Sequence, residues 1–394
     1  MSKIEGALSR GESTRRIYAA HGVLGYLLSG FGMILPELRQ DLGLGRAEVA
    51  LYPSAFALGL VLVGLCGDGL LRALGAQAMR SAIGAQIGGA LLLASGFGRL
   101  AGGVGALLFG LGLAIMVNFA PARFREDHGD LAPLAIAEAT GMASASSVLA
   151  PLVLGASLSA GKGWHMAFVA PPLVAALPLV VRAMPAAHTR EAPETRRPRE
   201  APRAPSGFFL LWLDVVLVVS VEFSVLFWAA DFLQVGRQLA SGTATSMVAL
   251  FVSGMATGRI ASTLVLRRVP RPGHVLAGSA AMATVGYAIF WQIDHTAATV
   301  LGLFATGLGV ALLYPLTLGA VMASWPDHPH RAAARGALAS GCAIGLAPLC
   351  LGMIADAVDL RAGMLLTPLI LVAFLIRCIV REVKSPALNR GVCS

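Results

Sequence analysis

Gly110-Leu-Gly-Leu-Ala114 and Ala150-Pro-Leu-Val-Leu-Gly155 decide the fold of this 394-residue chain, because each segment recurs 197 residues later. The copies are Gly307-Leu-Gly-Val-Ala311 and Ala347-Pro-Leu-Cys-Leu-Gly352. Two matches at a spacing of half the chain length indicate a duplicated unit. Both segments lie in long apolar stretches, so we expect the duplication to lie within a membrane. Internal repeats of this size are typical of secondary transporters.

Composition separates this chain from soluble proteins. Apolar residues make up 56% of it and charged residues 13%, about half the charged fraction of a soluble domain, and mean hydropathy is +0.75. The five cysteines show no CxxC pair and no metal-ligand spacing, so we expect no disulfide framework, no metal and no cofactor. The first 16 residues are polar, which indicates that no cleaved signal peptide is present.

Apolar stretches of about 20 residues, the length that crosses a bilayer, occur throughout the chain. We predict an all-α membrane protein with 12 transmembrane helices in two pseudo-symmetric six-helix bundles, residues 1–184 and 208–394. Residues 185–207, rich in Pro and Arg, form the predicted linker. The predicted spans are 17–37, 49–67, 78–98, 102–122, 132–158, 164–184, 208–233, 244–266, 274–293, 297–324, 332–357 and 361–381.

Basic residues divide unequally between the two sides of this topology. The side with both termini and the linker carries 23 Lys and Arg residues, the opposite side carries 6, and Arg259 lies within a span. Because basic loops stay in the cytoplasm, we predict a multi-pass protein of the inner cell membrane with cytoplasmic termini. The topology explains the net charge of +9, so nucleic acid is not an expected partner.

Three short motifs resemble those of a known family. Gly64-Leu-Cys-Gly-Asp68 with Arg72 resembles the cytoplasmic loop signature of the major facilitator superfamily, with the basic residue displaced and the following basic pair missing. The segment 163–168 resembles the family's entry to span six, and Gly258-Arg259 with Arg267-Arg268 resembles its span eight and following loop. The resemblance covers nearly the whole chain. It implies a monomeric transporter that works by alternating access in the bilayer.

Two further likenesses concern subfamilies. The segment 141–155 resembles the span-five motif of proton antiporters, with Ala-Pro in place of the usual Gly-Pro. Val221-Glu222 with Trp228, and Tyr314-Pro315, resemble fucose- and hexose-permease-like members. The two likenesses imply opposite directions of transport, so both directions stay open.

Glu222 is the main candidate for proton coupling and for substrate contact. It lies 14 residues into the span 208–233, near the membrane midplane, where ionisable side chains are costly and usually functional. Burial there favours the neutral form that a proton carrier needs. The alternative is a glutamate held by a fixed hydrogen bond or ion pair. Arg259 has three open roles, namely binding of an anionic solute, pairing with an acid, and snorkelling to the interface.

Five side chains complete the candidate cavity and coupling set. Tyr26, Asn118 and Tyr314 offer hydrogen bonds near the middle of the bundle. Trp228 either lines the cavity or packs in the core or against lipid. His21 titrates near neutral pH and is a second candidate for proton coupling, although a lone helix histidine also serves as a structural hydrogen-bonding group.

Other charged residues are candidates for gating. Asp68 and Arg72 follow span two, where Asp68 is expected to cap or pair with a neighbouring helix end. Asp214 and Asp231 lie near the two ends of the span 208–233, where gate or helix-end roles are expected.

Glu138 is a further gating candidate. It lies in the first turns of the span 132–158. We predict that it pairs with Arg123 or Arg125 in the preceding loop and acts as a conformational latch.

The motifs that are missing argue against an enzyme. The sequence contains no GxxxxGK[ST], no GxSxG and no zinc-ligand spacing. It contains only two asparagines, too few amides for a typical sugar site, which favours an amphipathic or largely apolar solute.

We therefore predict a proton-coupled transporter of a small organic solute, with efflux by proton antiport favoured. Proton-coupled uptake of a sugar or organic acid is the alternative. A rival from another class is a membrane sensor or scaffold that does not transport.

Overall fold

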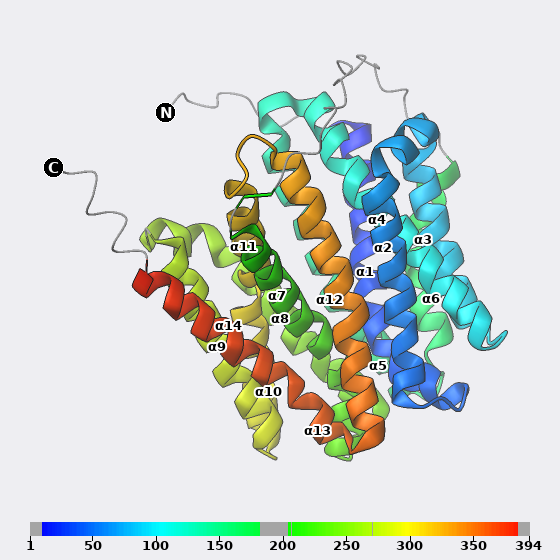
Figure 1. The fold of residues 1–394 in the computed structure, drawn as a ribbon. Helices are drawn as coiled ribbons and strands as arrows, with labels where there is room; N and C mark the ends of the chain where they lie inside the picture. Colours follow the sequence, from blue (N-terminus) through cyan, green and yellow to red (C-terminus); the bar gives the residue numbers. More distant parts are fainter. Residues whose placement is uncertain (1–9, 182–203, 206, 270, 385–394) are drawn as a thin grey trace.

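The computed structural model describes residues 10–181, 204–205, 207–269 and 271–384, and within them the chain is helical without β-strands (Figure 1). Most of the predicted linker, 185–207, lies outside the described residues. The first half contains α1 (Glu12–Asp41), α2 (Arg46–Leu74), η1 (Gly75–Gln77), α3 (Ala78–Ala94), α4 (Arg99–His128), η2 (Gly129–Leu131), α5 (Ala132–Ser159) and α6 (His165–Val181). The second half contains α7 (Phe208–Asp231), the π-helical turn η3 (Phe232–Gly236), α8 (Ser241–Arg268), α9 (Pro272–Gln292), α10 (Thr296–Val310), α11 (Leu313–Ala323), α12 (Pro329–Ala357), α13 (Leu360–Met364) and α14 (Leu366–Lys384).

Each predicted span coincides with one helix or with two consecutive ones. Among the described residues, nine segments are long and apolar enough to cross a membrane, and one of them, Arg99–Ser159, contains both α4 and α5. The helices α3 and α6 are shorter, with 17 residues each. The predicted spans 297–324 and 361–381 each consist of two helices, α10 with α11 and α13 with α14. The chain is thus an all-α membrane protein, as predicted.

Two helices extend beyond their predicted spans, which corrects the expected position of several candidates. The helix α2 continues to Leu74, so Asp68 and Arg72 lie on its last turns and not in a loop. The helix α4 continues to His128 and carries Arg123 and Arg125, which were also expected in a loop. Helices can run past the apolar region because their backbone hydrogen bonds are internal and need no help from the bilayer.

The repeated glycines occupy equivalent helix crossings in the two halves. A Cβ added to Gly105 would lie 2.7 Å from the carbonyl oxygen of Gly89, and one added to Gly302, its counterpart, would lie 2.8 Å from that of Gly286. Likewise, Gly110 packs on the backbone of α2 and Gly307 on that of α8. Such close backbone contact leaves no room for a side chain, so these positions require glycine. The duplication seen in the sequence is therefore a duplication of helix packing.

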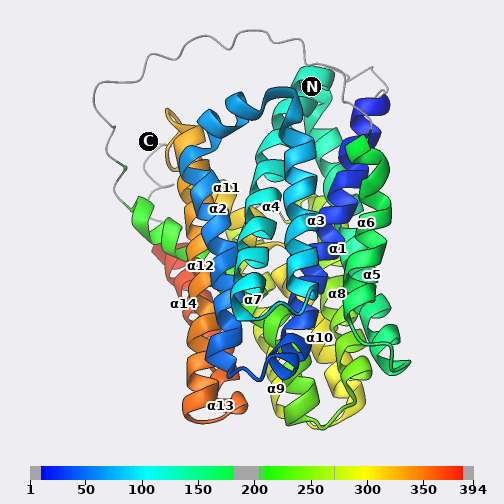
Figure 2. The same ribbon diagram turned by 90° about the vertical axis from the view of Figure 1, so that its right-hand side faces the viewer.

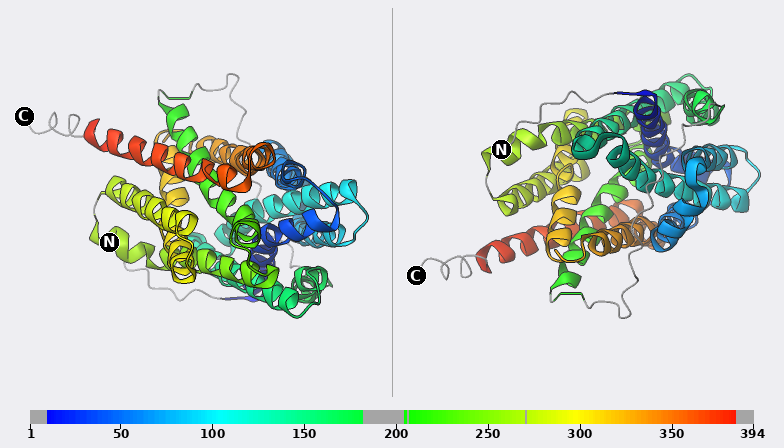
Figure 3. Two further views of the ribbon diagram at one scale, coloured as in Figure 1. Left: turned by 90° about the horizontal axis from the view of Figure 1, so that it is seen from below. Right: turned by 90° about the horizontal axis from the view of Figure 1, so that it is seen from above.

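The contacts between helices repeat in the same order. In the first half α3 packs on α4, α1 on α5 and α2 on α4, and in the second half α9 packs on α10, α7 on α12 and α8 on α10. Figure 3 shows the helices of the two halves as two groups that lie side by side. The contacts between the halves are also paired. The helix α2 of the first half packs on α12 of the second half, and in the equivalent contact α5 of the first half packs on α8 of the second half. Figure 2 shows α2 beside α12.

Small residues and aromatic rings form the interface between the halves. Gly155 of α5 and Gly242 of α8 meet with their backbones in contact. Ser54 Oγ of α2 donates a hydrogen bond to the carbonyl oxygen of Gly345 in α12 at 2.7 Å. At the centre, the ring of Phe31 in α1 meets that of Phe227 in α7 edge-on, with centroids 5.7 Å apart. Interfaces of this kind can tilt without breaking many directional bonds.

Candidate substrate and coupling site

An ion pair joins α7 and α8 inside the second half. Nη2 of Arg259 lies 3.3 Å from Oε1 of Glu222, and the two side chains are 36% and 16% exposed. Glu222 lies 14 residues after the start of α7 and nine before its end, which places the pair near the middle of the apolar layer. Of the three roles open for Arg259, the structure shows pairing with an acid.

A broken helix lies beside this ion pair. The helix α10 ends at Val310 and α11 begins at Leu313, and Pro315 has no N–H with which to join them into one helix. The side chain of Tyr314, at the start of α11, interacts with that of Ser340 in α12 and lies within electrostatic reach of Glu222. Polar groups from α7, α8, α11 and α12 thus converge, and broken helices at the midplane are common at transporter binding sites.

The first half has no counterpart of this group. The position that corresponds to Glu222 is Gly25, because the two differ by the repeat of 197 residues. Gly25 packs directly on the backbone of Ala143 in α5, with no space for a side chain. The candidate coupling site therefore belongs to one half only. The described residues also contain no cluster of His, Cys, Asp and Glu side chains placed to hold a metal ion.

Two of the candidate cavity residues form hydrogen bonds within the first half. The hydroxyl of Tyr26 donates to the carbonyl oxygen of Ala167 in α6 at 2.6 Å, and its side chain is buried. The amide of Asn118 donates to the carbonyl oxygen of Ala114 in its own helix at 2.8 Å. The prediction that Tyr26 lines an open cavity is wrong for this conformation, because its packing against α6 satisfies the hydroxyl. Asn118 is exposed.

His21 and Trp228 have the contacts expected of structural residues, which the sequence left open as the alternative to proton coupling and to lining the cavity. Nδ1 of His21 lies 2.9 Å from the carbonyl oxygen of Ile17, one turn earlier in α1. Trp228 is 3% exposed and packs beside Gly352 of α12. Of the three positions open for Trp228, the structure shows packing in the core, since a close helix crossing buries its ring. Of the predicted cavity residues, Glu222, Arg259 and Tyr314 are brought together.

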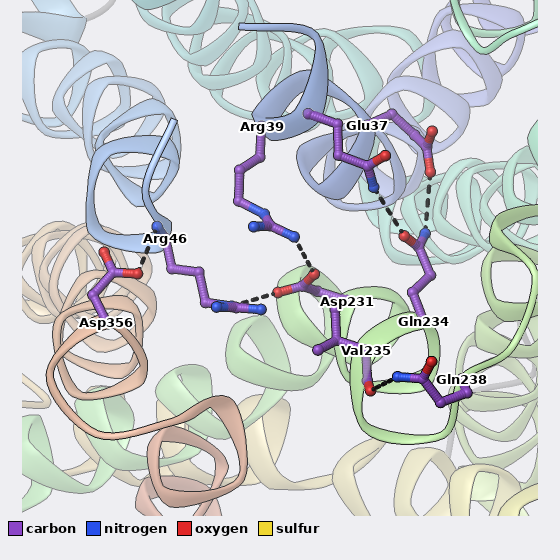
Figure 4. A network of polar contacts seen from close by, with 9 residues as sticks. Glu37, Arg39, Arg46, Asp231, Gln234, Val235, Gln238 and Asp356 are labelled. Carbon is purple, nitrogen blue, oxygen red and sulfur yellow. Dashed lines mark hydrogen bonds and ion pairs between the residues drawn. The ribbon is translucent and has the colours of Figure 1, made fainter. Parts of the chain in front are cut away.

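A network of polar contacts joins the two halves at the distal end, which we define as the end remote from Glu12 and Lys384 (Figure 4). Asp231, at the end of α7, lies between two arginines of the first half. Its Oδ1 is 2.9 Å from Nη2 of Arg39 and its Oδ2 is 2.9 Å from Nε of Arg46. Asp231 is buried, so these contacts hold a desolvated carboxylate between the halves.

Further contacts complete this network, which we call the distal lock. Asp356, near the end of α12, accepts hydrogen bonds from the backbone N–H groups of Arg46 and Ala47 at 3.0 and 2.8 Å. It therefore caps the start of α2 from the other half. Nε2 of Gln234 donates to Oε1 of Glu37 at 3.1 Å. Oε1 of Gln234 in turn accepts a hydrogen bond from Nε2 of Gln40 at 3.3 Å. The distal lock consists of Glu37, Arg39, Gln40, Arg46, Asp231, Gln234 and Asp356.

Sequence reasoning identified only Asp231 of the distal lock. One signal was present, because Glu37 and Gln234 differ by the repeat distance of 197 residues. Equivalent positions of two halves that pack symmetrically can meet on the symmetry axis. The arginines gave no such signal, since the sequence alone places them in an ordinary polar stretch between two predicted spans, 17–37 and 49–67.

Among the described residues, ionic contacts at the terminal end, where α1 begins and α14 ends, stay within one half. Glu138 pairs with Arg10 at 2.7 Å and accepts a hydrogen bond from Tyr18 at 2.8 Å, and its hydrogen bond and charge raise the pKa of Arg10. The predicted pairing of Glu138 with Arg123 or Arg125 is wrong. Arg123 points along its own helix to Asp127, 3.1 Å away.

The four other gating candidates also lie toward the terminal end. Asp214 of α7 pairs with Arg377 at 2.5 Å and with Arg381 at 3.2 Å, both from α14 of the same half. Arg125 and Arg72 are exposed, and the side chain of Asp68 lies outside the described residues. Among the described residues, the side-chain hydrogen bonds and ion pairs between the halves therefore gather in the distal lock and at Ser54.

The contact between α5 and α8 opens toward the terminal end. Gly155 and Gly242 touch near the distal end. Ala137 on α5 and Ile260 on α8 lie 18 residues, or five helical turns, from these glycines and on the same faces. Both are exposed, Ile260 by 81%. The two halves are therefore closed at the distal end and separated along this interface at the terminal end.

Comparisons with known proteins agree on one family. The sequence model of the Major Facilitator Superfamily matches residues 17–340. A search of curated proteins found no match. Among solved structures, a bacterial homologue of the human lysosomal transporter Spinster, inward-facing and occupied, has a TM-score of 0.73 at 15% identity, over 96% of this chain and 98% of that one.

Two other solved structures show the same fold. The E. coli fucose:proton symporter FucP has a TM-score of 0.59 at 16% identity, over 95% of this chain and 99% of that one. A peptide transporter POT has a TM-score of 0.73 at 15% identity, over 98% and 96%. With a family match over most of its length, this chain belongs to the Major Facilitator Superfamily and is a transporter.

Proposed function

We propose that this protein is a proton-coupled transporter in which Glu222 carries the proton and Arg259 binds an organic anion. The observation that carries the proposal is the 3.3 Å contact between Arg259 and Glu222 at mid-depth. While Glu222 is ionised, the two charges neutralise each other. When Glu222 takes up a proton, Arg259 is left with an uncompensated charge in an apolar layer. An anionic solute then compensates it.

This arrangement favours symport over antiport. The proton and the anion bind together, because binding of one makes room for the other, and such positive linkage moves both in the same direction. In an antiporter a cationic solute would compete with the proton for Glu222, and Arg259 already occupies that carboxylate. We therefore favour uptake driven by the proton gradient, and keep efflux by antiport as the alternative.

Alternating access follows from the asymmetric closure of the two ends. With cytoplasmic termini, as the distribution of basic residues predicts, the distal lock seals the outer side and the separated ends of α5 and α8 face the cytoplasm. This is an inward-facing state.

Transport in proteoliposomes tests the proposal. A panel of organic anions and cations is added outside vesicles that contain a pH-sensitive dye. Symport predicts acidification of the interior with an anion, whereas alkalinisation with a cation would establish antiport. If no organic ion of the panel moves or exchanges, the proposal fails.

Two substitutions separate coupling from binding. Glu222→Gln mimics the protonated carboxyl group, so we expect it to abolish accumulation driven by a pH gradient while exchange of labelled solute continues. Arg259→Gln removes the anion site and is expected to abolish both. Normal gradient-driven accumulation by the Glu222→Gln variant would overturn the role of Glu222.

A further inference from the structure

We propose that the terminal end of the second half binds the phosphate of an anionic phospholipid, in a pocket where α7 begins beside α12. The pocket has a volume of about 420 Å³. It lies apart from the coupling site and the distal lock. Its lining consists of Ala204, Pro205, Gly207, Phe208, Phe209, Trp212 and Arg335.

The cation of this pocket is held in place by aromatic rings. The guanidinium carbon of Arg335 lies 5.5 Å from the ring centre of Phe208 and 5.0 Å from that of Trp325. Nε1 of Trp212 donates to the carbonyl oxygen of Arg335 at 2.9 Å, which ties α7 to α12 at this point. Ring faces orient a guanidinium without using its N–H groups. These donors stay available for a ligand.

The N–H donors of Arg335 are suited to binding an anion. Within the described residues no carboxylate pairs with it. A planar guanidinium matches two oxygens of a phosphate, and charge-assisted hydrogen bonds of this kind are the strong ones. An exposed arginine that is already oriented therefore favours a phosphate over a neutral headgroup.

The rim of the pocket favours a lipid over free phosphate. The side chains of Phe209 and Leu210 are 68% and 52% exposed at the start of α7. The ring of Phe209 stacks on that of Trp212, with centroids 5.7 Å apart and planes inclined by 16°. Aromatic residues of this kind gather at membrane interfaces. An acyl chain would cover the exposed apolar surface, which inorganic phosphate would leave bare.

Native mass spectrometry of the full-length protein in neutral detergent tests this site. The probes are phosphatidylglycerol, phosphatidylcholine with the same acyl chains, and inorganic phosphate. The test variant is Arg335→Gln. The matched control is Arg331→Gln, which removes the same charge one turn earlier on α12 and outside the pocket lining.

We expect wild-type protein and Arg331→Gln to retain phosphatidylglycerol over phosphatidylcholine, and Arg335→Gln to retain about tenfold less, because it loses a charge-assisted contact. Equal losses in both variants, or equal retention of the two lipids, would overturn the proposal. So would displacement of phosphatidylglycerol by millimolar inorganic phosphate, which would identify a site for free phosphate. If Arg335→Gln does not fold, Arg335→Lys decides, with at least about threefold weaker retention expected from loss of the planar fork and unchanged retention contradicting the site.

Discussion

Asp231 and Asp214 lie near opposite ends of the same helix, α7, and are alike in almost every local respect. Their side chains are 2% and 3% exposed, and each accepts contacts from two arginines. The difference is the origin of those arginines. The partners of Asp231, Arg39 and Arg46, belong to the other half, whereas those of Asp214 belong to the same half.

This difference indicates that similar triads of a buried carboxylate and two arginines can have two functions. Around Asp214 the contacts are the same whichever way the two halves tilt, so they stabilise one bundle. Around Asp231 the contacts exist only while the distal end is closed, so they stabilise one conformation. The consequence is a bias in the conformational equilibrium.

The largest effect is expected from Asp231→Asn. Removal of one member of a buried ion pair costs about 3–5 kcal/mol, and here only the distally closed state bears the cost. We therefore expect the ratio of open to closed molecules to rise about 100-fold or more. Pulsed electron resonance distances between spin labels on the two distal loops would measure this. An unchanged distance distribution would contradict the lock.

The substitution Asp214→Asn is the matched control and the next largest effect. The cost is again about 3 kcal/mol, but both conformations bear it. We expect the melting temperature to fall by about 5 °C or more, with the same distances between the distal labels as in wild type. A shift of those distances would contradict the conclusion that Asp214 stabilises one bundle and does not select a conformation.

Helix caps provide a smaller version of the same contrast. Asp356 caps α2 across the halves, whereas Asp359 caps α13 within one half through a 2.6 Å contact with the N–H of Ala362. Loss of a cap costs about 1 kcal/mol. Asp356→Ala should therefore raise the open population about fivefold in the same distance measurement, and Asp359→Ala should leave it unchanged. Equal behaviour of the two variants would show that the cap on α2 does not distinguish the conformations.

The smallest effect is expected from Arg10→Gln. Arg10 is 57% exposed, and its pair with Glu138 lies within the first half. Exposed pairs contribute less than about 1 kcal/mol, so the melting temperature and the rate of solute exchange should both stay close to wild type. A several-fold change in exchange rate would restore Glu138 as a conformational latch with a new partner.

The sequence was most informative where the structure depends on helix geometry alone. The spans, the duplication and the depth of Glu222 follow from hydropathy and spacing, and the structure has one helix or two consecutive helices at each predicted span. The pairing of Glu138 could not be predicted, because its partner Arg10 is 128 residues away. The nearby Arg123 was the reasonable expectation. It pairs with Asp127 instead, since residues four apart on a helix face each other.

The candidate site shows the same division. Glu222, Arg259 and Tyr314 were each identified as polar groups in apolar spans, but their meeting depends on how α7, α8 and α11 cross. From the sequence, Tyr26 and Trp228 were equally plausible members of the same site. Only their packing against α6 and α12 shows that they are buried elsewhere and are not part of the cluster of Glu222, Arg259 and Tyr314.

The sequence by itself determined that this protein is an all-α membrane protein built from a duplicated unit, because hydrophobic length and repeat spacing are properties of the chain alone. The tertiary structure decided which charges meet, and therefore that the distal end is locked while α5 and α8 separate toward the terminal end. The physical reason is the distance along the chain over which each kind of interaction acts. Helical periodicity relates residues three or four apart, whereas an ion pair between halves requires two distant helices to stand at the right distance and depth.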